Sequence, residues 1–146
     1  MRIAFDLDNT LIISGHPFPL EPMGINPLRW IFLPERLRSG TVQLCRQLRK
    51  EGHEIWVYTS SMRSVWHIRK VFWLHGIHLH GVVNQAVHAE VVLHCCSKHP
   101  PSFHIDLLVD DLPGIALLGR NYGFRVALIA PDDVQWVEQV WANVRE

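Results

Sequence analysis

The chain has 146 residues, which fits a single domain, and 48% of them are hydrophobic, which excludes global disorder. Fourteen basic and fourteen acidic residues give a formal net charge of zero, so nucleic acid is not expected as a partner. The three cysteines form no disulfide framework. Neither a secretory signal nor an apolar run of about 20 residues is present, so a cytoplasmic protein without a membrane span is expected.

Short apolar runs alternate with helical patterns along the chain. Strands are expected at residues 2–7, 54–58, 82–83, 105–109 and 125–129, and helices at about 39–51, 61–75, 113–122 and from 132 or 133 to about 144. Residues 12–34 are rich in proline and glycine and predict an irregular segment, and residues 85–104 predict only a short helix. The alternation predicts one α/β domain over residues 1–146, a doubly wound, Rossmann-like three-layer sandwich with about five parallel strands.

Carboxylates and hydroxyls follow the predicted strands. Asp6 and Asp8 lie at the C-terminal end of the first strand, at a spacing that places both on one face. Thr59 and Ser60 follow the second strand, and the pair Asp110-Asp111 follows the fourth. Because parallel strands end at one edge of a sheet, these groups are expected to meet there. Like charges at such an edge need a cation, and the set suits a hard metal ion beside a carboxylate nucleophile.

Three lysines are candidates to balance this negative charge. Lys50 stands at the end of a predicted helix that points away from the edge, and Lys70 is in the middle of the next helix. Lys98 lies just before the fourth strand and is the candidate that can reach the site. Arg63, close after Thr59, is a candidate to contact a substrate anion, and a solvated helix arginine is the alternative.

In this order, the residues resemble the four motifs of the haloacid dehalogenase (HAD) superfamily of phosphatases. The matches are Asp6-Leu7-Asp8-Asn9-Thr10, then Thr59, Lys98 and Asp110-Asp111, and they span residues 3–111. The resemblance implies a phosphatase that hydrolyses a phosphomonoester, and it implies Mg²⁺ as the cofactor. The phosphorylated substrate, a small molecule or a macromolecule, stays open.

The resemblance also implies roles for these residues. Asp6 would be the nucleophile that forms an aspartyl-phosphate, and Asp8 would be general acid and then general base. Thr59 would donate a hydrogen bond to a phosphoryl oxygen, and Lys98 would neutralise charge. Ser60 and Arg63 are the expected substrate-binding residues.

The metal is implied to lie between the first and fourth motifs. Asp110, with Asp111 assisting, would hold Mg²⁺ together with Asp6 and the backbone carbonyl of Asp8. Magnesium prefers oxygen ligands and keeps several waters, so few carboxylates suffice.

The chain departs from the family in size. Many relatives carry a cap domain, whereas residues 12–34 here suffice only for a flap or loop, and residues 60–97 hold one predicted helix and one strand. The protein is therefore expected to be capless. Capless relatives have open sites, act on large substrates or use a neighbouring subunit as a lid, so some self-association is expected, as a homo-oligomer.

Two alternatives are phosphoacceptor signalling or binding modules that act through a macromolecular partner. In a receiver domain the lysine comes last, whereas Lys98 here precedes Asp110-Asp111. In a catalytically idle HAD member the motif residues would be lost, whereas Asp6, Asp8 and Lys98 are all present.

Further groups have simpler explanations. His94, Cys95, Cys96, His99 and His104 suggest zinc, but adjacent cysteines do not have the usual ligand spacing. Trp66 and Trp73, seven residues apart, predict a core stripe on one helix. The run Trp30-Ile31-Phe32-Leu33 is expected to pack in the core, with an exposed patch for a substrate or a second subunit as the alternative.

Overall fold

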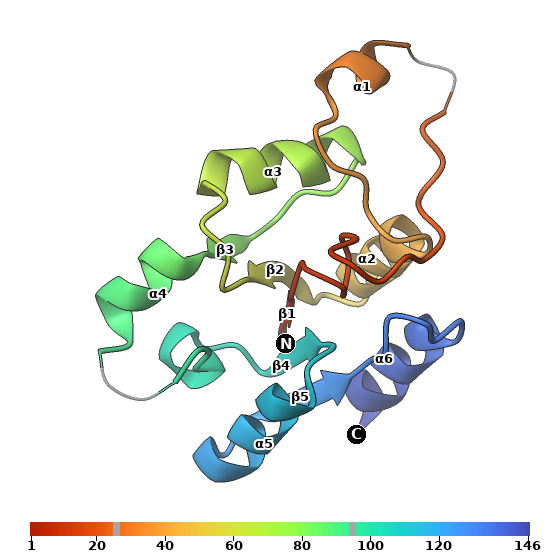
Figure 1. Cartoon of the computed structure of the whole chain (residues 1–146). Helices are drawn as coiled ribbons and strands as arrows, with labels where there is room; N and C mark the ends of the chain where they lie inside the picture. The colour runs from red at the N-terminus through yellow and green to blue at the C-terminus, as the bar shows by residue number, and fades with distance from the viewer. Residues whose placement is uncertain (25–26, 94–95) are drawn as a thin grey trace.

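A single parallel sheet of five strands forms the centre of the protein. The computed structural model describes residues 1–24, 27–93 and 96–146. The strands are β1 (Arg2–Phe5), β2 (Glu54–Tyr58), β3 (Gly81–Val83), β4 (Leu107–Asp110) and β5 (Arg125–Leu128). They are ordered β3-β2-β1-β4-β5, with β1 in the centre (Figure 1). The predicted doubly wound three-layer fold is confirmed.

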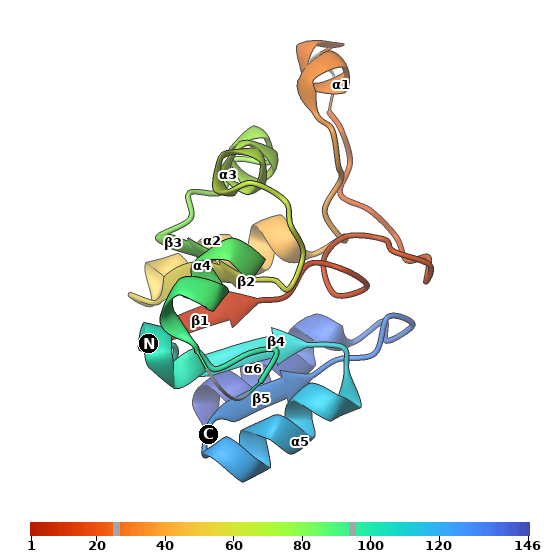
Figure 2. The same cartoon turned by 60° about the vertical axis from the view of Figure 1, so that its left-hand side comes forward.

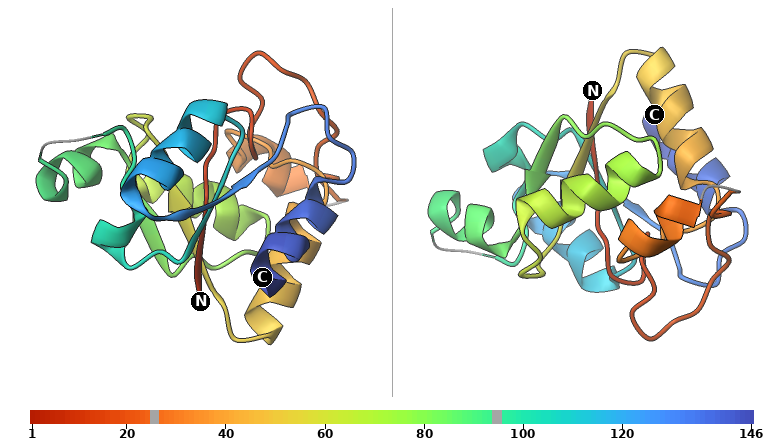
Figure 3. Two further views of the ribbon diagram at one scale, coloured as in Figure 1. Left: turned by 90° about the horizontal axis from the view of Figure 1, so that it is seen from below. Right: turned by 90° about the horizontal axis from the view of Figure 1, so that it is seen from above.

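Helices cover both faces of the sheet. They are α1 (Pro27–Phe32), α2 (Thr41–Lys50), α3 (Val65–Leu74), α4 (Gln85–Val91), α5 (Pro113–Tyr122) and α6 (Trp136–Arg145), with a 3-10 turn at Pro100–Phe103. Ile3 and Phe5 of β1 pack in the core with α2, α3 and α6, whereas Ala4 packs on the opposite side with α4 and α5. Figure 3 shows α2 and α6 side by side on one face. Among the described helices, none is long and apolar enough to cross a membrane.

The predicted element boundaries hold best where a turn residue ends the element. The helix α5 ends at Gly123, which has a φ of 72°, as the sequence predicts. The strand β1 ends at Phe5, two residues early, because the amides of Thr10, Leu11 and Ile12 all donate to the carbonyl of Leu7 in a tight turn. The helix α6 starts only at Trp136, because residues 130–135 form hydrogen-bonded turns.

The segment of residues 12–34, here called the flap, contains a helix that was not predicted. Pro27 reads as a breaker, yet it is the first residue of α1, where proline is tolerated because the first turn needs no amide donor. The flap carries α1 away from the sheet (Figure 2). Its two legs are joined at the base, where Glu21 N donates to Leu37 O and Ser39 N donates to Pro19 O, each at 2.8 Å.

Arg38 anchors the returning leg of the flap. The residue is buried, and its guanidinium donates to the carbonyls of Thr10, Ala130, Pro131 and Asp133. It also stacks between the rings of Phe18 and Trp136, with centroid distances of 4.7 and 5.0 Å. Arg38 therefore ties the base of the flap to the loop that precedes α6.

The prediction that the large aromatic residues pack in the core is wrong for both segments. Trp66 and Trp73 are 70% and 72% exposed, because the inward face of α3 is filled by Ile68, Val71 and Phe72. Ile31 and Phe32 of α1 are also exposed. The side chain of Trp30 lies outside the described part of the structure.

Candidate active site

Three carboxylates converge at the carboxyl edge of the sheet. Strands β1 and β4 are neighbours, and their register pairs Phe5 with Val109, so Asp6 and Asp110 come to lie side by side. The amide of Asp6 continues this pairing and donates to Val109 O at 2.9 Å. Asp6, Asp110 and Asp111 each offer an oxygen, and these atoms lie within 4.8 Å of one another.

Lys98 lies between two of these carboxylates. Its Nζ donates to Asp6 Oδ1 and to Asp110 Oδ2, each at 2.6 Å, and all three side chains are buried. Burial disfavours the charged amine, but Asp6 and Asp110 outweigh it and hold the pKa of Lys98 above its ordinary value. The lysine therefore stays positively charged in the site, as its position in the sequence predicts.

Asp6 is poised between protonation and ionisation. Burial raises the pKa of its carboxyl to about 6, while the charge of Lys98 works against this shift and that of Asp110 adds to it. The contact with Lys98 favours the ionised carboxylate, which is available as a nucleophile toward an electrophile that reaches it.

A buried hydrogen-bond network positions the segment that carries Lys98. The hydroxyl of Tyr58, at the end of β2, lies 2.6 Å from His88 Nδ1 and accepts from the amide of His99 at 2.8 Å. The other ring nitrogen of His88 lies 2.9 Å from the carbonyl of Cys96. Residues on both sides of Lys98 are thus fixed to β2 and α4, which explains how a lysine outside any helix or strand reaches the site.

We expect Tyr58→Phe to lower the free energy of unfolding by about 1 to 3 kcal/mol, because the variant leaves His88 and the amide of His99 without their partner. The same change should lower kcat of the reaction that the site catalyses, because the segment that carries Lys98 is no longer held in place. Urea denaturation and steady-state kinetics measure the two effects. Tyr122→Phe, on the partly exposed Tyr122 of α5, is the matched control and should be near neutral. Equal stability of the two variants would contradict the positioning role of Tyr58.

Asp8 lies apart from the three converging carboxylates and is held by Arg63. Two guanidinium nitrogens of Arg63 donate to the two oxygens of Asp8 at 2.9 and 3.1 Å. Arg63 also donates to both oxygens of Glu35 at 2.8 and 2.9 Å, and His67 lies 2.8 Å from the same carboxylate. Arg63 therefore links Asp8 to the residue that follows the flap, and a substrate anion would have to replace one of these carboxylates.

Arg63→Gln should lower kcat by about tenfold or more, because Asp8 loses the fork that orients its carboxylate. Arg63→Lys should restore little of the loss, since a lysine offers a point charge and cannot bind two carboxylates bidentately. Steady-state kinetics on all three proteins check this expectation. Full activity in the Lys variant would show that only the charge matters.

Hydroxyl groups line the rest of the site. Thr59 is buried at the end of β2, and its hydroxyl accepts from the amide of Ser61 and donates to the hydroxyl of Ser61, both at 3.1 Å. Ser60 is exposed beside it. Together with Asp6, Asp8 and Lys98, these residues line a cavity of about 340 Å³. The structure thus brings the predicted hydroxyls and charges into one cavity.

Three residues of the site were not predicted. Thr10 Oγ1 lies 3.3 Å from Asp6 Oδ2 and 3.2 Å from Asp111 Oδ1. Asn84 caps α4 and donates to the carbonyl of Arg63 at 2.9 Å. Two of the three could have been found from the sequence, because Thr10 is the last residue of the first motif and Asn84 precedes a helix. Nothing in the sequence indicates the contact of Glu35 with Arg63.

The zinc alternative finds no support in the described residues. Among the described residues, the one group of three or more possible metal ligands that lie close together is the set of three aspartates at the sheet edge. The ring of His99 lies 2.7 Å from the hydroxyl of Ser102, and the carbonyl of Cys96 lies 2.9 Å from the ring of His88. His94 and Cys95 lie outside the described residues.

The donor set at the sheet edge fits a hard divalent cation. Lys98 offsets one of the three negative charges of Asp6, Asp110 and Asp111, so an excess of negative charge remains. The donors are all oxygens, which suit Mg²⁺ rather than a soft metal. Burial and the charge of Asp110 raise the pKa of Asp111, as expected for a carboxyl that lacks enough positive charge nearby.

Comparison with known proteins supports the fold. No family model matches the chain, and a search of curated proteins finds no match. Among solved structures, a predicted HAD-like family hydrolase from Porphyromonas gingivalis is similar, with a TM-score of 0.58 and 11% sequence identity over 99% of this chain and 98% of that chain. At this identity the likeness shows the fold alone: the chain shares the α/β architecture of that structure, and its described residues contain no additional cap domain.

Proposed function

We propose that the protein is a Mg²⁺-dependent phosphatase that hydrolyses a phosphomonoester through an aspartyl-phosphate on Asp6. The observation that carries the proposal is the buried amine of Lys98, which lies 2.6 Å from both Asp6 and Asp110. This charge keeps the nucleophile ionised and orients it. It also offers positive charge where the oxygens of a phosphoryl group would arrive.

The residues of the cavity have complementary roles in this proposal. An oxygen of Asp6 attacks phosphorus, the bond from phosphorus to the leaving oxygen breaks, and Asp8 gives that oxygen a proton. Water then attacks phosphorus and gives a proton to Asp8, and the bond between phosphorus and Asp6 breaks. The hydroxyl of Thr59 donates to a phosphoryl oxygen. Arg63 holds the carboxylate of Asp8 in place by donating to both of its oxygens.

Asp6, Asp110 and Asp111 would hold the metal, with the backbone carbonyl of Asp8 as a further oxygen. When bound, Mg²⁺ would offset the charge of the phosphoryl oxygens. The test is phosphate release from a panel of sugar phosphates, nucleotides, phosphoamino acids and phosphorylated oligonucleotides, with Mg²⁺ and with EDTA. Release that requires Mg²⁺ supports the proposal. Binding of Mg²⁺ without hydrolysis of any compound would contradict it.

A second candidate is a phosphoacceptor module, in which phosphorylated Asp6 persists. The observation that favours it is the buried contact of Lys98 with both Asp6 and Asp110, because a lasting phosphoacceptor needs the same charges as a phosphatase. Incubation with acetyl phosphate and Mg²⁺, followed by intact-mass measurement, distinguishes the two. A lasting mass increase of one phosphoryl group that Asp6→Asn abolishes supports the module, whereas rapid return to the unmodified mass supports the phosphatase.

A further inference from the structure

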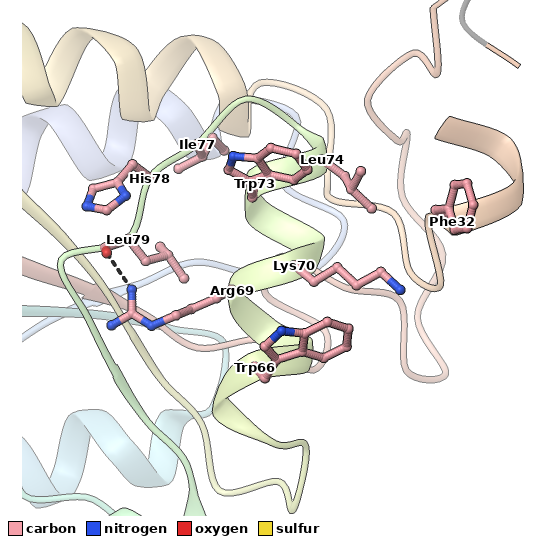
Figure 4. A pocket seen from close by; sticks show the side chains of 9 residues that line it. All are labelled: Phe32, Trp66, Arg69, Lys70, Trp73, Leu74, Ile77, His78 and Leu79. Carbon is pink, nitrogen blue, oxygen red and sulfur yellow. Dashed lines mark hydrogen bonds between the residues drawn. The ribbon is translucent and has the colours of Figure 1, made fainter. Parts of the chain in front are cut away.

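An open groove of about 560 Å³ lies outside the catalytic cavity, between α3 and α1. Figure 4 shows Lys70 and Leu74 projecting from α3 toward Phe32 of α1, with the indole rings of Trp66 and Trp73 on either side of Lys70. The two helices are in contact at one end, where the Arg29 side chain donates to the carbonyl of Leu74. The groove is therefore formed by the flap and by α3, the helix that follows Thr59, Ser60 and Ser61.

The aromatic rings of the groove are available to a ligand. Trp66, Trp73 and Phe32 are 70%, 72% and 54% exposed. Seven helical residues correspond to a rise of about 10.5 Å, so the two tryptophans are spaced for bases two or three nucleotides apart in a single strand. Stacking on an exposed indole is open to any base, because every base has a π face.

The charge of the groove is positive, although the chain as a whole is neutral. Residues 55–89 contain no aspartate or glutamate, whereas Arg69 and Lys70, which line the groove, fall in this stretch. Lys70 Nζ lies 5.1 Å from the ring centroid of Trp66, and Arg69 donates to the carbonyl of Leu79, which also lines the groove. Glu35, which contacts the first turn of α3, is already paired with Arg63 and His67. The groove thus complements an anionic partner.

The groove leads toward the candidate active site. Thr59, Ser60 and Ser61 line the catalytic cavity, and α3 begins at Val65, four residues after Ser61. Trp66 stands in the first turn of this helix, nearest to the cavity. A strand lying along α3 would therefore present its end to Asp6.

We propose that the groove binds a single-stranded nucleic acid, with bases stacked on Trp66 and Trp73 and phosphates near Lys70 and Arg69, and that the substrate is a phosphate monoester at the end of that strand. The second clause rests on the proposed phosphatase function. Regular anionic charge combined with planar apolar rings distinguishes such a strand from an acidic peptide, which offers charge alone. The net charge of zero led to the expectation that nucleic acid is not a partner, because the total does not show the local excess of positive residues at the groove.

Binding is tested apart from catalysis with the full-length Asp6→Asn variant and a fluorescently labelled ten-residue oligothymidylate. We expect anisotropy to report saturable binding at low salt. Trp73→Ala should weaken it at least fivefold, the fold-change that corresponds to about 1 kcal/mol for one lost stacking contact. Lys70→Gln should weaken binding and reduce the slope of log K against log salt by about 1.

Matched controls lie on the opposite face of the sheet, in α5. Leu117→Ala and Arg120→Gln remove an exposed apolar and an exposed basic side chain there, and both should leave the affinity unchanged. The proposal is overturned if the oligonucleotide does not bind, or if polyglutamate binds equally well. It is also overturned if Trp73→Ala instead abolishes binding to anionic phosphatidylserine vesicles or self-association measured by light scattering.

The substrate clause is tested with the active protein and Mg²⁺ on oligothymidylates carrying a 5′ or a 3′ terminal phosphate. The ratio of kcat/KM for the preferred oligonucleotide to that for p-nitrophenyl phosphate should fall at least fivefold in Trp73→Ala. An unchanged ratio with intact binding would overturn the substrate clause. If the unmodified protein binds the oligonucleotide but hydrolyses neither compound, the result counts against the phosphatase function and not against the groove.

Discussion

Asp6→Asn is expected to lower kcat for phosphate release by a factor on the order of 10⁴ or more, since the amide cannot act as the nucleophile. The variant should still fold, because Lys98 keeps its contact of 2.6 Å with Asp110 and the amide is nearly isosteric with the carboxyl group. Single-turnover kinetics and circular dichroism measure the two properties. Asp132→Asn, at an exposed carboxylate, serves as the control and should retain full activity. Hydrolysis by Asp6→Asn at the rate of the unmodified protein would disprove the assignment of Asp6.

Lys98→Met is expected to be the most destabilising single change at the site. It removes the positive charge shared by Asp6 and Asp110 and leaves two buried carboxylates together, which costs about 3 to 5 kcal/mol for a broken buried pair. Urea denaturation in EDTA measures the loss. Lys50→Met, at the exposed end of α2, should cost less than about 0.5 kcal/mol.

Magnesium provides a second measurement on the same pair of variants. Because a bound cation would replace part of the lost charge, Mg²⁺ should raise the unfolding free energy of Lys98→Met more than that of the unmodified protein. Equal gains for the two proteins would show that the metal does not share the carboxylates that Lys98 contacts.

The sheet and the convergence of charges at its edge could be predicted from the sequence because both follow from local patterns. Apolar runs at strand spacing predicted the sheet, and the ends of parallel strands lie at a common edge, so Asp6, Thr59 and Asp110 had to lie near one another. The position of Lys98 in the site, in contrast, depends on contacts between residues that are far apart in the sequence. It is placed by hydrogen bonds of Tyr58 and His88, residues 40 and 10 positions away, and no periodic pattern indicates such contacts.

The exposure of Trp66 and Trp73 could not be predicted for a related reason. Helical spacing indicates which side chains share a face but not which face the rest of the chain covers. In α3 apolar residues occur on nearly every side, and Ile68 and Phe72 face the sheet while the tryptophans face outward. The ion pairs of Arg63 could not be predicted either, because its partners Asp8 and Glu35 lie 55 and 28 residues away in the sequence.

The anchoring of Arg38 has a consequence for how such a protein can change over evolution. The carbonyls of Thr10 and Ala130 bind this arginine at the base of the flap, and the paired legs at Glu21 and Leu37 close it off. Insertions, deletions or replacements confined to α1 leave these hydrogen bonds, and the contact of Glu35 with Arg63, in place. The outer part of the flap can therefore diverge while the site below it keeps its geometry.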